Sequence, residues 1–505
     1  MFYPLLHNTI RPYFAGTSRP SHVSWHLAAL CLIALPLTGC GLIRLGPDYQ
    51  APATKTLASQ WHADSSRLAH QADSAQLNDW WQQFNDPALL QLLKASQEQS
   101  PTLADATAKI VQARGEATVA GMANLPSLDV NLSSTRSAVS FLGPMFLSTN
   151  NRAALQSSWE IDLFGSLARQ REAADASLTA TTAHWHDARV SLAAETAQTY
   201  VQYRHCERLV QLIAEEARSR AETARLTALA GEAGFQSPAN VALAQAGANE
   251  AASNLLHQEL QCTVQVKAIA ALTAIDENDL RTLLGPAKAN LPAPRQLTVS
   301  KVPADTLAQR PDLLAAEREL ASASANIGYN EAQRLPILTL SGYIAPIRLT
   351  TGGQTFGART WSIGPNLTLP IFDGGQREAN VEVAKAQYLT AEKTYRQKVR
   401  DAVREVEEAL VRLQSLAARE QLSKDTARDY GRSLQATQAS QQAGMASLLD
   451  LEEARRLSLN AQMSALTVQQ DQVLSWIALY RAMGGGWQAN AANELPNGDQ
   501  AALAD

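Results

Sequence analysis

The segment LPSLDVNL, residues 125–132, returns 210 positions later as LPILTLSG, residues 335–342. Both copies alternate apolar with polar side chains, which is the period of a β-strand with two different faces. A repeat this long is half of the molecule and not the unit of a solenoid. The sequence therefore predicts two similar halves. The same offset relates further pairs: Pro101 and Pro311, Gly234 and Gly444, and Ser237 and Ser447.

Each half is expected to contain two strands, at about 126–136 and 152–163 and at about 336–348 and 358–371. Outward loops are expected at 140–151 and 350–358. No stretch after residue 40 has the length and hydropathy of a membrane helix, so only a closed β-barrel could span a bilayer. Membrane barrels start at about eight strands, so a chain with four would have to oligomerise to span. A half-buried sheet of a soluble domain is the alternative.

The rest of each half predicts a very long helical hairpin. Helices at about 166–230 and 375–443 would each be about 100 Å long, more than a globular core needs. Apolar side chains in both repeat every three, four or seven residues, as in a left-handed coiled coil. The residues of this stripe are Leu178, Trp185 and Leu192 in the first helix, and Val399, Val403, Val406, Leu410, Leu413 and Ala417 in the second.

Each long helix reverses at a turn of small residues, at about 231–238 and 443–447. These turns would be the tips of the hairpins, with Ser237 and Ser447 as N-caps of the returning helices. Cys206 lies 28 residues before Gly234 and Cys262 lies 28 after it. We therefore expect the two cysteines side by side, either as a disulfide or as two free thiols.

The N-terminus has the pattern of a lipoprotein signal peptide over residues 1–39. A short apolar run, residues 27–37, leads into Leu37-Thr38-Gly39-Cys40, and Arg11 and Arg19 precede it. Cleavage before Cys40 would leave a cysteine that carries lipid.

Composition argues against several other functions. The formal net charge is −5, and no basic cluster alternates with aromatic residues, so nucleic acid is not an expected partner. We find no nucleophile motif, phosphate loop or ligand cluster, so neither an enzyme nor a cofactor or metal is expected. His184 and His186 are two residues apart on a helix and would point to different faces.

Four motifs in order resemble the outer-membrane efflux proteins, the TolC-like family, and most closely its lipoprotein NodT-type branch. They are GPDY at 46–49, WWQQFNDP at 80–87, QRPDL at 309–313 and PIFDGG at 370–375. The resemblance implies a mainly α protein with a membrane β-barrel. In the family a homotrimer forms a 12-strand barrel in the outer membrane, which a periplasmic α-helical barrel continues.

The resemblance also implies a passive exit duct, anchored by lipid in the outer membrane. It would export drugs or other small toxic compounds that a resistance-nodulation-division or other inner-membrane pump delivers through a periplasmic adaptor. An exit duct for type I protein secretion is the first alternative. A periplasmic coiled-coil adaptor or structural lipoprotein is the second.

The resemblance assigns candidate roles to the hairpin tips. Asp450 matches an acidic residue that closes the periplasmic end of related channels, although it could also be only a first-turn acid favoured by the helix dipole. Ala446 stands where the resemblance would place a bulkier apolar residue, and its small side chain argues against a hydrophobic constriction at the tips. Candidate adaptor-docking residues, whose alternative role is turn and cap chemistry alone, are Gly234, Ser237, Gly444 and Ser447.

The expected domain organisation has six parts. The signal peptide (1–39) is followed by an N-terminal strap and equatorial segment (40–100) in which Trp80 and Trp81 are apolar anchors. The remaining parts are the first repeat (101–275), an equatorial linker (276–310), the second repeat (311–486) and a disordered tail (487–505).

Overall fold

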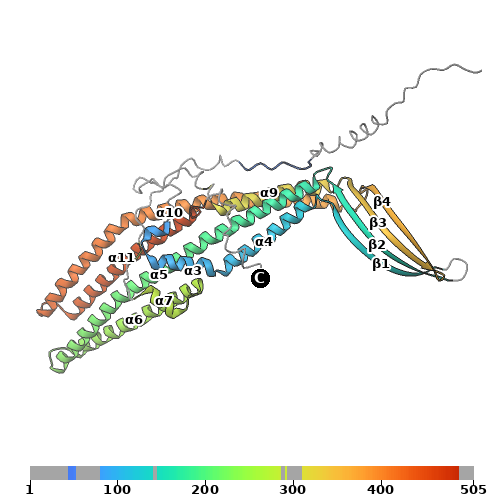
Figure 1. Cartoon of the computed structure of the whole chain (residues 1–505). Coiled ribbons are helices and arrows are strands. Elements are labelled where there is room, and N and C mark those ends of the chain that lie inside the picture. Colours follow the sequence, from blue (N-terminus) through green and yellow to red (C-terminus); the bar gives the residue numbers. More distant parts are fainter. Residues whose placement is uncertain are drawn as a thin grey trace, which may run out of the picture.

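The computed structural model describes residues 44–52, 80–139, 145–285, 291–292, 307 and 310–487. The expected signal peptide, Cys40, the tail beyond Trp487 and most of the equatorial linker lie outside these residues. The molecule is elongated, with a small sheet at one end and the ends of two helical hairpins at the other (Figure 1). Among the described helices, none has the length and apolar character required to cross a membrane.

The sheet has four antiparallel strands in the order β1-β2-β3-β4: β1 (Ser127–Val139), β2 (Phe146–Ile161), β3 (Ile337–Thr351) and β4 (Gln354–Thr368). The two repeats are therefore adjacent, because β2 pairs with β3. Strands β1 and β4 form the two edges and have no partner strand within the described chain.

The strands are longer than expected, and the expected loops include residues that belong to strands. Residues 146–151 belong to β2, and β3 joins β4 through a turn at Gly352 and Gly353, both with positive φ. Such two-residue hairpin turns require positive φ. The simple alternation breaks near this end because Ile347 and Leu349 lie on the face that is polar elsewhere, while Arg348 lies on the other.

The two faces of the sheet differ in chemistry. Because directly paired residues share a face, the register places one set of large side chains together on what we call the apolar face. Leu132 and Trp361 on this face are 75% and 74% exposed. The opposite, polar face carries residues such as Asn131, Gln156 and Ser341. The residues of the apolar face are Leu128, Val130, Leu132, Leu155, Trp159, Ile161, Leu338, Leu340, Ile344, Trp361, Ile363 and Leu367.

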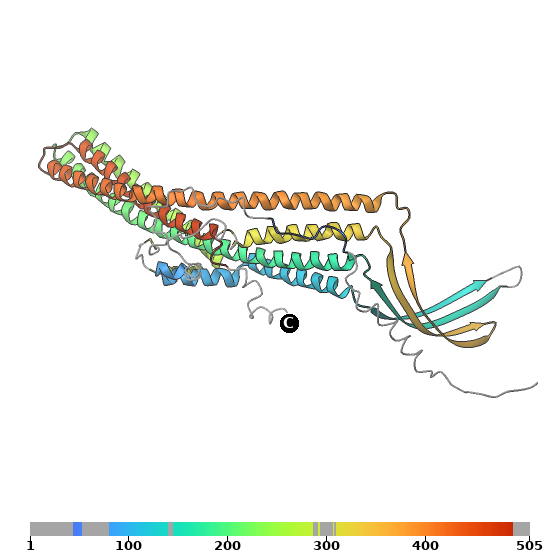
Figure 2. The ribbon, with the colours of Figure 1, turned by 90° about the horizontal axis from the view of Figure 1, so that it is seen from above.

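Each repeat has one helix that runs the length of the helical region. In the first repeat α5 (Ser166–Glu232) contacts α4 (Pro101–Met122) near the sheet and α6 (Pro238–Thr273) beyond it. In the second, α10 (Gln376–Gln442) contacts α9 (Pro311–Ala332) and α11 (Leu448–Ala482) in the same way. Viewed from above, α4, α5, α9 and α10 all extend from the sheet (Figure 2).

Glycine and proline set the ends of these helices. Gly165 and Gly375, 210 residues apart, precede α5 and α10 with φ of 76° and 86°, a conformation that costs glycine little. Pro101, Pro238 and Pro311 occupy the first position of their helices, where a missing N–H does no harm.

The largest hydrophobic core lies midway along the helices, where α5, α6, α10 and α11 meet three short elements. These are η4 (Trp80–Phe84), α3 (Pro87–Gln99) and α7 (Glu277–Leu284). Trp80 is 2% exposed and its ring stacks on that of Tyr480. Trp185, from the predicted stripe, packs with Leu103 and Ile110 in a second core nearer the sheet.

The segment 44–52 lies against the helices next to the sheet. The Arg169 Nε atom donates to the Leu45 carbonyl (3.0 Å), and an Arg169 Nη2 atom pairs with Asp48 (2.7 Å). The Tyr49 hydroxyl donates to Glu317. A Cβ atom at Gly328 would lie 2.5 Å from the Leu45 carbonyl oxygen, so glycine is required where this strap crosses α9.

Candidate functional site at the hairpin ends

The first hairpin ends in a turn centred on Gly234. The N–H of Phe235 donates to the Ala230 carbonyl (2.7 Å) and the N–H of Gly234 to the Gly231 carbonyl (3.0 Å). Gly234 has φ of 78°, as the residue after a helix commonly does. The Ser237 hydroxyl then accepts from the Asn240 N–H (3.2 Å) and caps α6.

The second hairpin ends with the same construction at Gly444, whose φ is 76°. Its N-cap is more elaborate because two residues cap each other. The Ser447 hydroxyl accepts from the Asp450 N–H (3.1 Å), and the Asp450 carboxylate accepts from the Ser447 N–H (2.9 Å) and hydroxyl (2.6 Å). The two bonds that the carboxylate accepts from Ser447 lower the pKa of Asp450, which is exposed. In the single chain the Asp450 carboxylate therefore caps the N-terminus of α11 as part of a capping box.

Both tips expose large apolar side chains that are not among the residues predicted from the sequence. Phe235 and Met445 follow the turn glycines and are 83% and 79% exposed. Leu449, one residue before Asp450, is 65% exposed. The signal was available in the sequence, because Phe235 and Met445 are also 210 residues apart. Exposed apolar residues at a tip indicate a contact surface.

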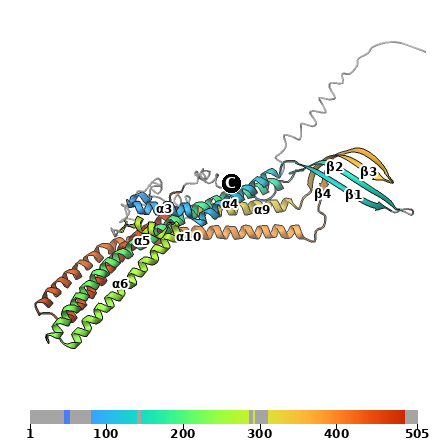
Figure 3. The same cartoon turned by 60° about the horizontal axis from the view of Figure 1, so that its bottom comes forward.

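The two hairpins contact each other close to their tips (Figure 3). Arg220 on α5 pairs with Glu216 on the same helix (2.7 Å) and with Glu452 on α11 (3.2 Å). Glu452 also pairs with Arg455, whose side chain is 5% exposed. Leu448 packs nearby against Ala224, Ala244 and Ala248. The start of α11, and with it Asp450, is thus fixed against the first hairpin.

Cys206 on α5 and Cys262 on α6 are joined by a disulfide, with their Cα atoms 5.5 Å apart. Of the two arrangements that the sequence left open, the structure contains the cross-link. It joins the helices of the first hairpin well away from the tip, near the central core.

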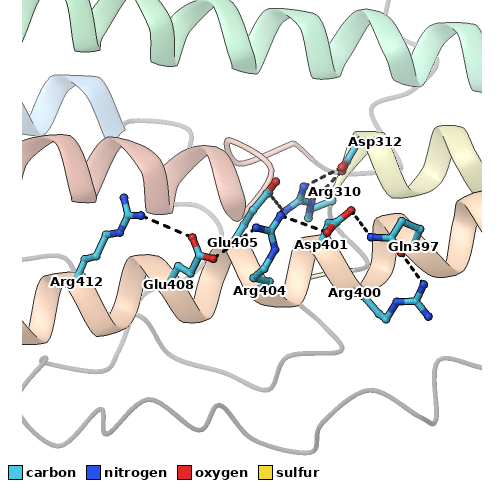
Figure 4. A network of polar contacts seen from close by, with 9 residues as sticks. All are labelled: Arg310, Asp312, Gln397, Arg400, Asp401, Arg404, Glu405, Glu408 and Arg412. Atoms are coloured by element: carbon cyan, nitrogen blue, oxygen red, sulfur yellow. Dashed lines mark hydrogen bonds and ion pairs between the residues drawn. The ribbon is translucent and has the colours of Figure 1, made fainter.

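A second charged cluster lies between the helices of the second repeat (Figure 4). The buried Arg310 donates to Asp312 on α9 (2.9 and 2.8 Å), to Glu405 on α10 (2.9 Å) and to the Ala482 carbonyl at the end of α11 (2.9 Å). Burial alone would raise the pKa of Asp312, but the hydrogen bonds and positive charge of Arg310, together with Lys398 and the Leu313 N–H, outweigh it and lower this pKa. The cluster holds three helices in register at the level of the core.

The two neighbouring histidines occupy different surroundings. The His184 Nε2 atom lies 2.7 Å from Glu319 on α9, whereas the His186 ring packs against Trp185 and Trp487. Burial, with the nearby Arg189, lowers the pKa of His186 to about 4. In the part of the chain that the structure describes, no three His, Cys, Asp or Glu side chains gather as a metal site would require.

A sheet with one exposed apolar face, continued by paired helical hairpins, defines a class of elongated membrane-associated channel proteins. The model of the family "Outer membrane efflux protein" matches residues 92–274 and 302–485, which together are most of this chain. The chain belongs to the outer membrane efflux protein family.

Two relatives and one solved structure show how far the similarity extends. Nodulation protein T of Rhizobium leguminosarum bv. viciae is 32% identical, over 92% of this chain and 94% of that protein. The solvent efflux pump outer membrane protein SrpC of Pseudomonas putida is 28% identical, over 90% of this chain and 97% of its own length. The outer-membrane channel OprN has 28% identity and a TM-score of 0.80, over 88% of this chain and 99% of that one. The fold is therefore that of the outer-membrane channels.

Proposed function

We propose that this chain is the outer-membrane channel subunit of a tripartite efflux system. It gives drugs or other small toxic compounds a passive exit after an inner-membrane pump and a periplasmic adaptor deliver them. The observation that carries the proposal is the division of the molecule into a sheet with an apolar face at one end and two helical hairpins with exposed apolar tips at the other. Relatives named as solvent and antibiotic efflux proteins support the class of cargo. In this role the chain carries out no chemistry and uses no cofactor.

The proposed assembly is a homotrimer whose sheets join edge to edge. Within the described residues β1 and β4 have no partner strand, and an exposed edge is a template for pairing with another strand. Twelve strands would exceed the about eight that membrane barrels need as a minimum. The apolar face then meets lipid and the polar face lines the duct.

The proposed anchor is a lipid on Cys40. The strap of residues 44–52 supports this, because the Leu45 N–H donates to the Phe164 carbonyl at the junction between β2 and α5. The chain is thus held where a membrane boundary is expected, five residues after Cys40. Replacing Cys40 with serine should abolish the incorporation of labelled fatty acid.

The proposed docking surface for the adaptor is the pair of tips, with Gly234, Ser237, Gly444 and Ser447 shaping the turns. Phe235 and Met445 would supply its apolar contacts, since large exposed side chains of this kind are enriched in interfaces.

The test is photo-crosslinking in living cells with the reactive residue at Phe235 or at Met445. Neither side chain takes part in capping, so the turns should remain intact. Thr135, an exposed residue of the polar face of β1, is the control position. We expect the tip positions, and not Thr135, to capture an adaptor that belongs to a resistance-nodulation-division or similar pump. Capture of the adaptor of an ATP-driven protein exporter would replace efflux by protein secretion. No tip-specific capture would contradict the assignment.

A further inference from the structure

Apart from the strand ends next to the helices, the sheet has an unusual charge distribution. Residues 130–159 and 340–372 contain no aspartate, glutamate or lysine. Their charged side chains are four arginines: Arg136, Arg152, Arg348 and Arg359. A positive charge of this kind without a carboxylate nearby favours an anionic partner.

The register separates the four arginines by face. Arg136 is level with Thr149 and Thr350, Arg348 with Asn151 and Gly357, and Arg359 with Pro346. Ala358 and Ile347, the chain neighbours of Arg359 and Arg348, pair with each other on the polar face. Because successive side chains point to opposite faces, the three arginines lie on the same side as Leu132 and Trp361, that is, on the apolar face. All three are exposed. Arg152 lies on the opposite face, with its guanidinium 4.6 Å from the centre of the Tyr343 ring.

The three arginines begin where the apolar band ends. On β3 the band runs from Leu338 to Pro346, eight residue steps, or about 27 Å along the strand at about 3.4 Å per residue. A strand tilt of about 40° reduces this to about 21 Å along the membrane normal, close to the apolar height of about 25 Å in known barrels. Arg348 and Arg136 follow directly beyond this band, toward the turn at Gly352. With the sheet placed in the outer membrane as proposed, these two arginines would stand at the level of the lipid head groups.

Two of these arginines are close enough to repel each other. Arg348 pairs directly with Gly357, so Arg359 occupies the diagonal position on the neighbouring strand. Diagonal neighbours on one face lie about 7 Å apart, within reach of two long side chains. A bound anion between them would turn this repulsion into attraction. Ser134 and Asn151, level with Arg348 and hydrogen-bonded to each other at 2.7 Å, add polar groups at the same height.

We propose that Arg136, Arg348 and Arg359 form a binding site for the phosphate groups of a phosphorylated glycolipid in the outer leaflet. The inference rests on the proposed placement of the sheet in the outer membrane. Arginine suits the task because its planar fork of N–H donors binds phosphate oxygens in pairs. The adjoining apolar band suits the acyl chains, which favours a lipid over free phosphate.

The test measures lipid binding by the purified full-chain assembly with native mass spectrometry. The probes are diphosphorylated lipid A, the same lipid without phosphate, and inorganic phosphate. The unchanged protein should bind the phosphorylated lipid about tenfold more tightly than the dephosphorylated one, since hydrogen bonds to charged groups are the strong ones. Inorganic phosphate at the same concentration should not displace it.

The triple variant R136Q/R348Q/R359Q should lose this preference. The matched control is Arg152→Gln, which removes one charge at the same level but on the opposite face, and it should keep the preference. Equal binding of both lipids by the unchanged protein would overturn the proposal, and this comparison needs no variant. A preference retained by the triple variant, a preference lost by the control, or displacement by inorganic phosphate would also overturn it. Conductance of the triple variant in phosphatidylcholine bilayers tests the channel function separately.

Discussion

At the scale of single residues, buried charges carry more of the structure than the many exposed ion pairs. Arg310 satisfies two carboxylates and one carbonyl on three helices, and its side chain is 8% exposed. Arg404, on α10, pairs with Asp401 and Glu408 but is 60% exposed. Exposed pairs contribute little because water screens them and ordering two long side chains costs entropy.

We therefore predict that Arg310→Met destabilises the protein by about 3 kcal/mol, because it leaves the largely buried Asp312 without its partner and also removes the bonds to the Ala482 carbonyl and to the half-exposed Glu405. The loss should appear in guanidinium unfolding followed by circular dichroism. Arg404→Met is the control and should change stability by less than about 0.5 kcal/mol. Equal effects of the two substitutions would show that the cluster around Arg310 contributes no more to stability than an exposed ion pair does.

A second prediction for a single residue concerns the loss of stability at low pH. Because the folded protein lowers the pKa of His186 from 6.5 to about 4, folding favours the neutral ring. This contribution is complete above about pH 6.5 and disappears as the pH falls toward 4. It amounts to about 2 kcal/mol after an allowance for solvent screening.

The measurement is the unfolding midpoint as a function of pH for the unchanged protein, His186→Gln and His186→Phe. Both replacements are neutral at every pH, so both should flatten the profile between pH 4 and 6.5. The unfolding midpoints of the two variants at pH 7 depend on how each new side chain packs, so a difference between them there does not bear on the prediction. A profile that keeps its slope in both variants would exclude His186 as the titrating group.

At the scale of elements, the disulfide is the main covalent constraint on the first hairpin. It closes a loop across 56 residues of separation, which includes the whole distal part of α5 and α6. We predict that the double variant C206S/C262S lowers stability by about 3 kcal/mol through the larger freedom of its unfolded chain. A reducing agent should have the same effect on the unchanged protein and none on the variant. Peptide mapping without reductant should yield the two cysteine peptides linked, and rapid alkylation of either thiol in the native state would contradict this.

The elements were predictable to the extent that their patterns are local. Strand alternation beside Leu128, the N-cap at Ser447 and the glycines at both tips all follow from a few neighbouring residues. The β2–β3 pairing could not be read in the same way, because it joins segments almost 200 residues apart. Strand ends were misjudged where Ile347 and Arg348 exchange the faces expected of them. The link between Arg220 and Glu452 escaped because it depends on how two hairpins rotate against each other, which no single helix pattern specifies.

At the level of the assembled channel, we propose that the hairpin tips close the duct at rest, as the resemblance to related channels implies. Asp450 would then have two roles: it caps α11 through Ser447, and in the proposed trimer three copies around an axis would bring like charges together. Asp450→Asn should raise the conductance of the resting channel in planar bilayers if the carboxylates hold the closed arrangement. Ser447→Ala removes the hydroxyl cap, at a cost of about 1 kcal/mol, but keeps the charge and should leave conductance nearly unchanged. If Ser447→Ala opens the channel equally, the cap and not the charge is responsible. An effect of Met445→Ala or Leu449→Ala alone would assign closure to apolar contacts.

The unpaired edges of the four-stranded sheet also have a consequence for genetics. In the proposed trimer, other copies of the chain complete the β1 and β4 edges, so a single chain would not function alone and a defect in one subunit would affect the whole assembly. When normal and defective subunits are made in equal amounts and mix at random, only about one trimer in eight contains normal chains alone. A variant that still assembles but cannot open should therefore impair a cell that also carries the normal gene. A variant that cannot assemble should be recessive.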